Sequence, residues 1–421
     1  MSLSIERIEF LLLVAGIVAL LARRIGLPYT VGLVAAGAAL TFAPIAPTVS
    51  LTKDLIFSAF LPPLIFEAAI QMQWRPLRRD LPVTAMLATL GVALSAGITA
   101  AGIRWLIGWD WSTAILIGVV LAATDPVSVI ATFKEMGVHG RLRMLVEAES
   151  LFNDGTAAVL FTVALAAMSG GGVSAASSLM LFAWTLFGGV AFGLLVGGVI
   201  LLLVGRTEDH LIEVTFTTVA AYLSFLIAEH FHASGVLAAL SCGILVGNFG
   251  CVTALSERGR EGVYNFWEYA AFVANSLIFL LIGLQLARQR FAEYWLPALI
   301  VICLIMAGRA AAVYGCSALF RASRLRVSAA HQHVLFWGGL RGALALALVL
   351  GLPTTMPHRY AVITVTFAAV AFSIIAQGLT MSPLLRRLGE LPAGESRRGT
   401  DAGGEAPANV TGEPSTRSSM K

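Results

Sequence analysis

Long apolar segments follow one another along almost the whole chain, and they restrict it to a single class of fold. Thirteen runs of roughly the 17–25 residues that cross a bilayer as a helix lie between charged residues or Gly/Pro breaks. Their approximate limits are 7–22, 29–44, 54–72, 82–106, 112–134, 143–169, 177–205, 211–230, 234–249, 263–287, 296–320, 332–351 and 358–386. Charged residues make up 12% of the chain, against about 25% in a soluble domain. The sequence therefore predicts an all-α polytopic membrane protein with about 13 transmembrane helices, and the continuous runs exclude a transmembrane barrel.

The basic residues between these segments predict the orientation of the chain. If the N-terminus lies outside, the inner loops carry most of the basic residues, at 23–24, 75–79, 134–143, 206, 258–260 and 321–326. Such an excess of Lys and Arg is typical of cytoplasmic loops. We therefore expect a multi-pass protein of the cell (inner) membrane, with its N-terminus outside and its C-terminus in the cytoplasm. The net charge of +4 belongs to these loops and does not indicate a nucleic-acid partner.

Two further features concern the organisation of the chain. Residues 388–421 are rich in Gly, Ser, Glu and Pro and lack apolar periodicity, which predicts a disordered cytoplasmic tail after a transmembrane domain of residues 1–387. Glycines at four-residue spacing in the segment 188–198 indicate a face for close helix packing. The sequence leaves open whether this face packs inside the protomer or across a dimer.

Two carboxylates lie deep inside apolar segments. Asp125 stands in GVVLAATDPVSVI and Asp154 in LFNDGTAAVLFTV. A charge at this depth costs about 2.5–3.5 kcal/mol on insertion scales, and it persists mostly where it faces a bundle interior or a water-filled cavity. These residues therefore indicate an ion or proton pathway.

Two of the apolar segments are interrupted at matching places in the halves formed by spans 1–6 and 8–13. Pro126 follows Asp125 in span five, and a proline in a helix interior breaks the hydrogen-bond ladder. Span twelve contains Trp337-Gly-Gly-Leu-Arg341-Gly342. Interrupted helices at corresponding positions of inverted repeats are typical of secondary transporters. Arg341 could neutralise Asp125 or the helix ends that it faces, although a purely structural kink and a purely compensating arginine remain alternatives.

Span six carries a set of oxygen ligands. Glu147, Ser150 and Asp154 share one helix face, and Glu149 and Asn153 share an adjacent one. Carboxylates and a hydroxyl suit a hard cation such as Na⁺. No His or Cys accompanies them, which argues against zinc or iron and against any resident cofactor.

The remaining buried charges suggest partners for this set. Arg309 lies in the apolar segment ICLIMAGRAAAVYG, and it is the expected ion-pair partner of Glu149. Glu67 lies near the end of span three in LPPLIFEAAI. The sequence does not distinguish an ion-path role for Glu67 from that of a packed structural carboxylate.

These motifs resemble the NhaP-type, NHE-like branch of the monovalent cation/proton antiporters. The resemblance rests on FLPPLIFEAAI, ATDPVSV, ESLFNDGTA, Arg309 and GGLRGALALAL, and it extends to about Arg387. It implies the NhaA-like antiporter fold of inverted repeats with two crossing broken helices. It also implies a homodimer, whose core helices include 54–169 and 263–386 while the remaining helices form the dimerisation side.

The resemblance also implies roles for single residues. The main carrier of cation and proton would be Asp154, with Na⁺ bound at Asp154, Ser150 and Thr124 and with Asn153 supporting the site. Glu149 and Arg309 would form a structural pair, and the break at Asp125 would cross the one at Arg341. Members with Asn-Asp at positions 153–154 resemble the electroneutral branch of the family.

The function predicted in this way is exchange of Na⁺ for H⁺ by alternating access. One carboxylate suffices because Asp154 can hold either Na⁺ or H⁺. The empty site is unfavourable, since it would leave an uncompensated charge at mid-depth in the membrane. One-to-one exchange follows if Asp125 stays paired. The ligand types do not separate Na⁺ from Li⁺ or K⁺, so a K⁺/H⁺ antiporter of the same fold is an alternative.

Two other classes of protein are disfavoured. A cation channel is disfavoured because opposed broken helices suit alternating access. A membrane aspartyl protease is disfavoured because no Gly-x-Gly-Asp segment occurs, and we expect no enzymatic activity.

Overall fold

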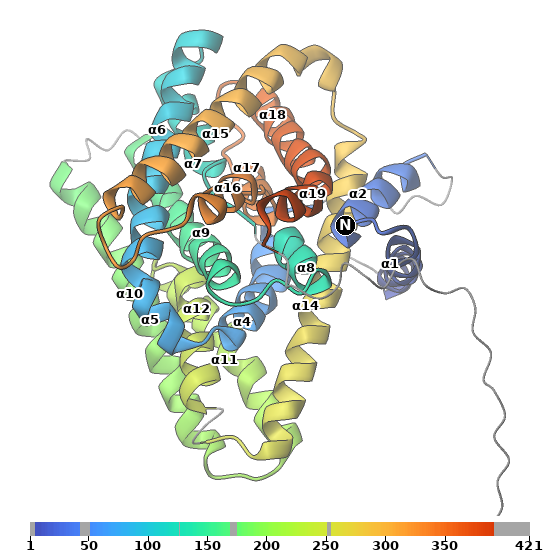
Figure 1. The fold of residues 1–421 in the computed structure, drawn as a ribbon, viewed down its shortest axis with the longest axis vertical. Coiled ribbons are helices and arrows are strands. Elements are labelled where there is room, and N and C mark those ends of the chain that lie inside the picture. The colour runs from blue at the N-terminus through green and yellow to red at the C-terminus, as the bar shows by residue number, and fades with distance from the viewer. Residues whose placement is uncertain (1–4, 43–50, 126, 169–174, 251–253, 391–421) are drawn as a thin grey trace, which may run out of the picture.

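The computed structural model describes residues 5–42, 51–125, 127–168, 175–250 and 254–390, and within these ranges every regular element is a helix. Five π-helical turns, labelled η, continue or join α-helices (Figure 1). The elements are α1 (Ile5–Ile25), α2 (Tyr29–Leu40), α3 (Lys53–Leu55), η1 (Ile56–Phe60), α4 (Leu61–Gln71), α5 (Trp74–Met86), η2 (Leu87–Gly91), α6 (Val92–Gly102), η3 (Ile103–Ile107), α7 (Trp111–Val120), α8 (Val127–Glu135), α9 (Arg141–Met168), α10 (Ala175–Val204), α11 (His210–His230), α12 (Gly235–Leu245), η4 (Val246–Gly250), α14 (Glu257–Leu286), α15 (Phe291–Leu319), α16 (Ala329–Trp337), α17 (Ala343–Leu350), α18 (Arg359–Phe372), η5 (Ser373–Gln377) and α19 (Gly378–Leu388).

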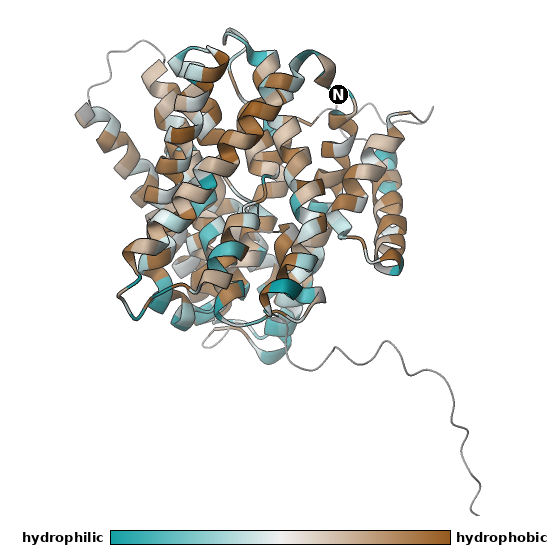
Figure 2. Cartoon of the chain, turned by 45° about the horizontal axis from the view of Figure 1, so that its top comes forward, coloured by the Kyte–Doolittle hydropathy of each residue, from teal (hydrophilic) through white to brown (hydrophobic). Residues whose placement is uncertain are grey.

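The protein is an all-α, multi-span membrane protein, as predicted. Eight of the described helices are long and apolar enough to cross a membrane, and shorter apolar helices accompany them. Figure 2 shows mostly hydrophobic helix surfaces, with hydrophilic residues gathered near the helix ends. Each of the thirteen expected segments falls on a helix or on a pair of half-helices. The count of about 13 membrane crossings itself stays a prediction. The predicted tail lies outside the described residues from 391 onward, and α19 reaches Leu388, one residue past the expected end of the transmembrane domain.

Polar caps fix where several of these apolar helices begin. Asp110, Ser234, Ser256 and Ser328 precede α7, α12, α14 and α16, and each accepts a hydrogen bond of 2.9–3.3 Å from a backbone N–H of the first turn. The first N–H groups of a helix have no partner within it, so a side-chain oxygen at this position stabilises the helix start. The caps therefore set helix boundaries that hydrophobicity alone leaves open.

Both predicted breaks are present, and they cross. The chain is non-helical between α7 and α8, and again between α16 and α17. The two breaks touch directly, because the backbone N–H of Asp125 donates to the carbonyl of Leu340 at 2.8 Å. Pro126, to which the first break was attributed, lies outside the described residues. The NhaA-like crossing that the sequence predicted therefore exists, and it exposes backbone ends inside the protein.

The helices pack in two groups. In the first group, α1, α2, α4, α10, α11, α12 and α14 contact one another, and in the second α5 to α9 pack with α15 to α19. Figure 1 shows α15 to α19 in the upper half and α11 and α12 below. The expected division into core and dimerisation helices, which placed 54–72 and 263–287 with the core, stays a prediction. The structure packs α4 on α12 and α14, and α14 on α2.

Close backbone contacts explain this grouping. An added Cβ on Gly37 of α2 would lie 2.2 Å from the carbonyl oxygen of Leu280 on α14, and one on Gly247 of η4 would lie 2.1 Å from that of Ile70 on α4. Only glycine permits such an approach, as is common where membrane helices meet. The glycine face of α10 also packs inside the protomer, because a Cβ on Gly193 would lie 2.2 Å from the carbonyl oxygen of Ala238 on α12.

Candidate ion-binding site

A cluster of oxygen atoms forms where α9 passes the first break. Ser150 donates a hydrogen bond to the carbonyl of Thr124 at 2.5 Å, and the two hydroxyl groups lie 3.1 Å apart. Asn153 donates through Nδ2 to the Thr124 hydroxyl at 3.1 Å and to the carbonyl of Ala122 at 3.1 Å. The helical spacing on α9 and the open backbone of the break thus bring together three of the predicted site residues.

Asp154 lies one turn further along α9. Its carboxylate lines the same cavity as Thr124 and Asp125. Its Oδ1 is buried and has no hydrogen-bond partner in the part of the chain that the structure describes. Leaving a buried acceptor unsatisfied costs about 1–3 kcal/mol, and more for a charged group. The empty coordination position at Oδ1 therefore fits a proton or a small cation.

Asp125 is held by helix ends. Its Oδ1 accepts from the backbone N–H of Val127, the first residue of α8, at 2.9 Å, and its Oδ2 lies against Gly342, the residue before α17, where an added Cβ would be 1.9 Å away. The N-terminal end of a helix carries about half a positive charge. Two such ends meeting at Asp125 compensate its charge.

No ion pair joins Arg341 to Asp125 among the described residues, so the compensation of Asp125 by Arg341 stays a prediction. The Arg341 guanidinium donates to the carbonyl of Gly339, and its backbone N–H donates to the hydroxyl of Ser373 at 3.0 Å. Its charge acts on Glu149 and Asp154. Arg341 thus contributes positive charge behind the site, and it holds the second break against η5.

Glu149 and Arg309 form a buried bidentate ion pair, in the arrangement expected from the sequence. The two N–H···O contacts measure 2.6 and 3.0 Å, and Arg309 also donates to the carbonyl of Leu335 at 2.8 Å. The exposed fractions of the two side chains are 3% and 7%. The pair joins α9 to α15 and to α16, directly behind Asn153, which also contacts Glu149 at 3.4 Å.

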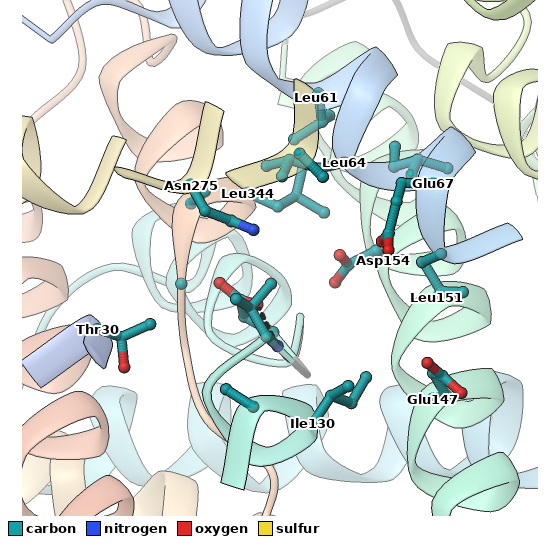
Figure 3. A pocket seen from close by; sticks show the side chains of 18 of the residues that line it. Thr30, Leu61, Leu64, Glu67, Ile130, Glu147, Leu151, Asp154, Asn275 and Leu344 are labelled. Atoms are coloured by element: carbon teal, nitrogen blue, oxygen red, sulfur yellow. Dashed lines mark hydrogen bonds between the residues drawn. The ribbon is translucent and has the colours of Figure 1, made fainter. Parts of the chain in front are cut away.

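A cavity of about 270 Å³ leads to Asp154 between the two helix groups. Figure 3 shows Glu67 of α4 and Asp154 and Glu147 of α9 around it. Glu67 accepts a hydrogen bond from Gln71, and Glu147 lies 3.8 Å from Arg143. Glu67 thus faces the cavity from the first helix group, while Asp154 belongs to the second.

Sequence reasoning missed several residues of this cavity. Lys134 of α8 and Glu268 and Asn275 of α14 also line it. Lys134 was counted only as an inner-loop charge, although it ends the broken helix that begins beside Asp125. Glu268 offered a clearer signal, because it is a carboxylate inside the predicted apolar span 263–287.

Comparisons with known proteins agree with this geometry. The family described as "Sodium/hydrogen exchanger, transmembrane" matches residues 10–387. The chain is 38% identical to the Na⁺/H⁺ antiporter ApNhaP of Aphanothece halophytica, over 88% of this chain and 72% of that protein. It is 32% identical to the Na⁺/H⁺ antiporter NhaP of Pseudomonas aeruginosa, over 80% of this chain and 81% of the relative.

A solved structure shares the fold. The sodium proton antiporter MjNhaP1 from Methanocaldococcus jannaschii superposes with a TM-score of 0.74 at 19% identity, covering 91% of this chain and 98% of that one. At this identity the likeness concerns the arrangement of the helices alone. Together with the match over residues 10–387, it leads to one conclusion: the chain belongs to the sodium/hydrogen exchanger family.

Proposed function

We propose that this protein exchanges Na⁺ for H⁺ across the cell membrane and that Asp154 carries both ions in turn. The observation that carries the proposal is the buried Oδ1 of Asp154, which has no partner among the described residues and lies beside a cavity. The names of the relatives support Na⁺ and H⁺ as the two ions. No cofactor other than these ions is required.

The oxygen atoms around Asp154 suit a dehydrated Na⁺. The carboxylate would supply the charge, and the oxygens of Ser150 and Thr124, which lie within hydrogen-bonding distance of each other, would supply neutral ligands. Asn153 donates to one lone pair of the Thr124 hydroxyl oxygen, and the second lone pair is left for the ion. Glu67 would act from the other side of the cavity, where the ion arrives. Oxygen ligands alone favour a hard cation and do not rank Na⁺ against Li⁺ or K⁺.

Coupling follows from competition for one position. A proton and a Na⁺ ion cannot occupy Oδ1 together, and leaving the buried carboxylate without either is unfavourable. The site would therefore cross only when loaded. Since either ion gives it the same net charge, exchange would be electroneutral with one Na⁺ for one H⁺. The helix ends at Asp125 and the Glu149–Arg309 pair keep the other buried charges constant.

Two finer proposals concern the assembly and its placement. The cavity opens toward Gln71, Lys134 and Glu268, which stand at the ends of segments assigned to the cytoplasmic side. We therefore place the opening in the cytoplasm, with the N-terminus outside and the C-terminus inside. A homodimer, with dimer contacts on the first helix group, is consistent with the family.

Asp154→Asn tests the carrier role directly, because the amide keeps the shape and loses the charge. The purified Asp154→Asn variant is placed in proteoliposomes with an internal pH dye. Its rate of Na⁺-dependent proton movement should be at least about 100-fold below that of the unaltered protein, since the position that binds both ions is removed. Asp54→Asn, at an exposed carboxylate of α3, is the matched control and should behave as the unaltered protein. Exchange retained in Asp154→Asn would refute the proposal. Running Na⁺, Li⁺ and K⁺ in parallel identifies the cation and separates the K⁺/H⁺ alternative.

A further inference from the structure

An ion pair crosses the mouth of the cavity. Lys134 lies in the last turn of α8 in the second helix group, and Glu268 lies on α14 in the first. Their N···O distance is 3.8 Å, and their side chains are 43% and 66% exposed. Exposed pairs of this kind stabilise a fold by about 0–1 kcal/mol at most. The position of this pair therefore calls for an explanation other than stability.

The pair stands where two cavities meet. Gln71, Lys134 and Glu268 line both the cavity that leads to Asp154 and a second, more open cavity of about 410 Å³. The outer part of the second cavity is formed by the segment after α4 and by η4. A cation that moves from the solvent through both cavities thus passes directly beside the Lys134 ammonium.

The Lys134 ammonium acts on more than one carboxylate. Besides its contact with Glu268, its charge acts on Glu67 and Glu147 further into the cavity. Glu67 also experiences the charges of Glu147 and Glu268. One flexible ammonium thus stands among three carboxylates that an arriving Na⁺ must also pass. A lysine is a compact, strongly hydrated point charge on a mobile stem, so it can shift between such neighbours.

We propose that Lys134 is a tethered competitor of the transported cation: it occupies the carboxylates at the cavity mouth and so sets the apparent affinity for Na⁺ on that side. This inference rests on the proposed Na⁺/H⁺ exchange. It assigns Lys134 and Glu268 to the tuning of cation access, separate from the carrier step at Asp154. The local concentration of cations in a cleft follows the charge that lines it.

The alternative is a mechanical latch that holds the two helix groups together. The two alternatives differ in whether Lys134→Gln and Glu268→Gln shift the apparent KM for Na⁺ in the same direction or in opposite directions. In a latch, loss of either partner breaks the same contact, so Lys134→Gln and Glu268→Gln shift transport in the same direction. If Lys134 is a competitor, Lys134→Gln makes the mouth more negative and strengthens Na⁺ binding there. Glu268→Gln instead releases the ammonium toward Glu67 and Glu147 and weakens Na⁺ binding.

The experiment measures initial rates of exchange against Na⁺ concentration for full-length protein in proteoliposomes, at fixed pH and with ionic strength held constant by choline chloride. Lys134→Gln should lower the apparent KM for Na⁺ about threefold or more and leave kcat nearly unchanged. Glu268→Gln should raise the KM, and the double variant should return close to the original value. Lys134→Arg should also stay close to it, because the positive charge is kept.

Arg78→Gln is the matched control, since it removes an exposed positive charge at the inner end of α5, away from both cavities. It should leave the KM unchanged. The effect of Lys134→Gln should also shrink at high salt, where exposed charges are screened. Shifts in the same direction for Lys134→Gln and Glu268→Gln, or no shift for either, would overturn the inference. Absence of Na⁺-dependent exchange in the unaltered protein would instead overturn the proposed function.

Discussion

At the residue scale, the site is defined by which buried groups have partners and which do not. Asp125 accepts a hydrogen bond from the start of α8 and lies against the start of α17, and Glu149 bonds Arg309 through two contacts. Asp154 retains a buried oxygen with no described partner. A carboxylate that already accepts hydrogen bonds cannot exchange ions readily, because each released bond would have to be replaced. This difference supports the proposal that Asp154, among several buried carboxylates, carries the transported ion.

The Thr124 hydroxyl gives a prediction about affinity. Thr124→Val keeps the shape of the side chain and removes an oxygen ligand, so the apparent KM for Na⁺ should rise about tenfold, the effect of losing one hydrogen-bond-sized interaction. Exchange at saturating Na⁺ should persist, because Asp154 remains. Thr162→Val, at an exposed threonine on the same α9 helix, is the control. An unchanged KM in Thr124→Val would remove this hydroxyl from the ligand set.

The Glu149–Arg309 pair gives a prediction about stability. Removing one partner of a buried pair leaves an uncompensated charge and typically costs about 3–5 kcal/mol. Arg309→Ala should therefore reduce the yield of folded protein and lower its thermal transition in detergent, while the KM of the remaining folded fraction changes little. Arg288→Ala, at an exposed arginine, should have neither effect. Normal yield combined with a collapse of Na⁺ affinity would instead assign Arg309 to ion binding.

Sequence reasoning reached some of these contacts and missed others for physical reasons. The Glu149–Arg309 pair could be predicted because a carboxylate in an apolar span requires a cation, and Arg309 was a buried arginine free to supply it. The backbone N–H of Val127 that bonds Asp125 could not be predicted, since backbone amides at helix ends leave no mark in the amino-acid pattern. Lys134 stands at the end of an apolar span, where a charged residue needs no functional explanation, whereas Glu268 lies inside the span 263–287 and its signal was overlooked.

At the element scale, the two breaks depend on close contact between backbones. A Cβ on Gly342 would lie 1.9 Å from Oδ2 of Asp125, so Gly342→Ala should push Asp125 away from the start of α17. We expect loss of most exchange activity, with a smaller fall in thermal stability. Gly16→Ala is the control, because a Cβ there meets nothing within 4 Å. Full exchange activity in Gly342→Ala would show that the crossing tolerates this displacement.

The elements also show where apolar patterns stop being informative. Both interruptions were predicted, because Pro and Gly mark them directly. The contacts of α4 with α12 and α14 could not be predicted, since nearness along the chain gives no guide to which helices touch. The evidence for the helix grouping lies in single glycines such as Gly37 and Gly247, whose contacts only the folded chain displays.

At the scale of the whole molecule, the cavity that leads to Asp154, which we propose as the ion path, lies between two helix groups. Asp154 and the broken helices belong to the second group, whereas Glu67 and Glu268 face the path from the first. Alternating access would therefore move the loaded site relative to the wall formed by α4 and α14. The fixed charges of the second group take part equally in both directions of this movement. The net charge moved per cycle, and with it the dependence of transport on membrane voltage, is therefore decided by what Asp154 carries.

This argument predicts electroneutral exchange. With Na⁺ or H⁺ bound, Asp154 contributes the same net charge, and the partners of Asp125, Glu149 and Arg309 stay unchanged during the movement. A Na⁺ concentration jump on proteoliposomes adsorbed to a solid-supported membrane, at equal pH on both sides, should give no transport current, although a pH dye reports proton movement in the same vesicles. Liposomes with Asp154→Asn define the background signal. A current that saturates with Na⁺ and is absent from that variant would mean that a second charge, with Asp125 as the first candidate, crosses the membrane in each cycle.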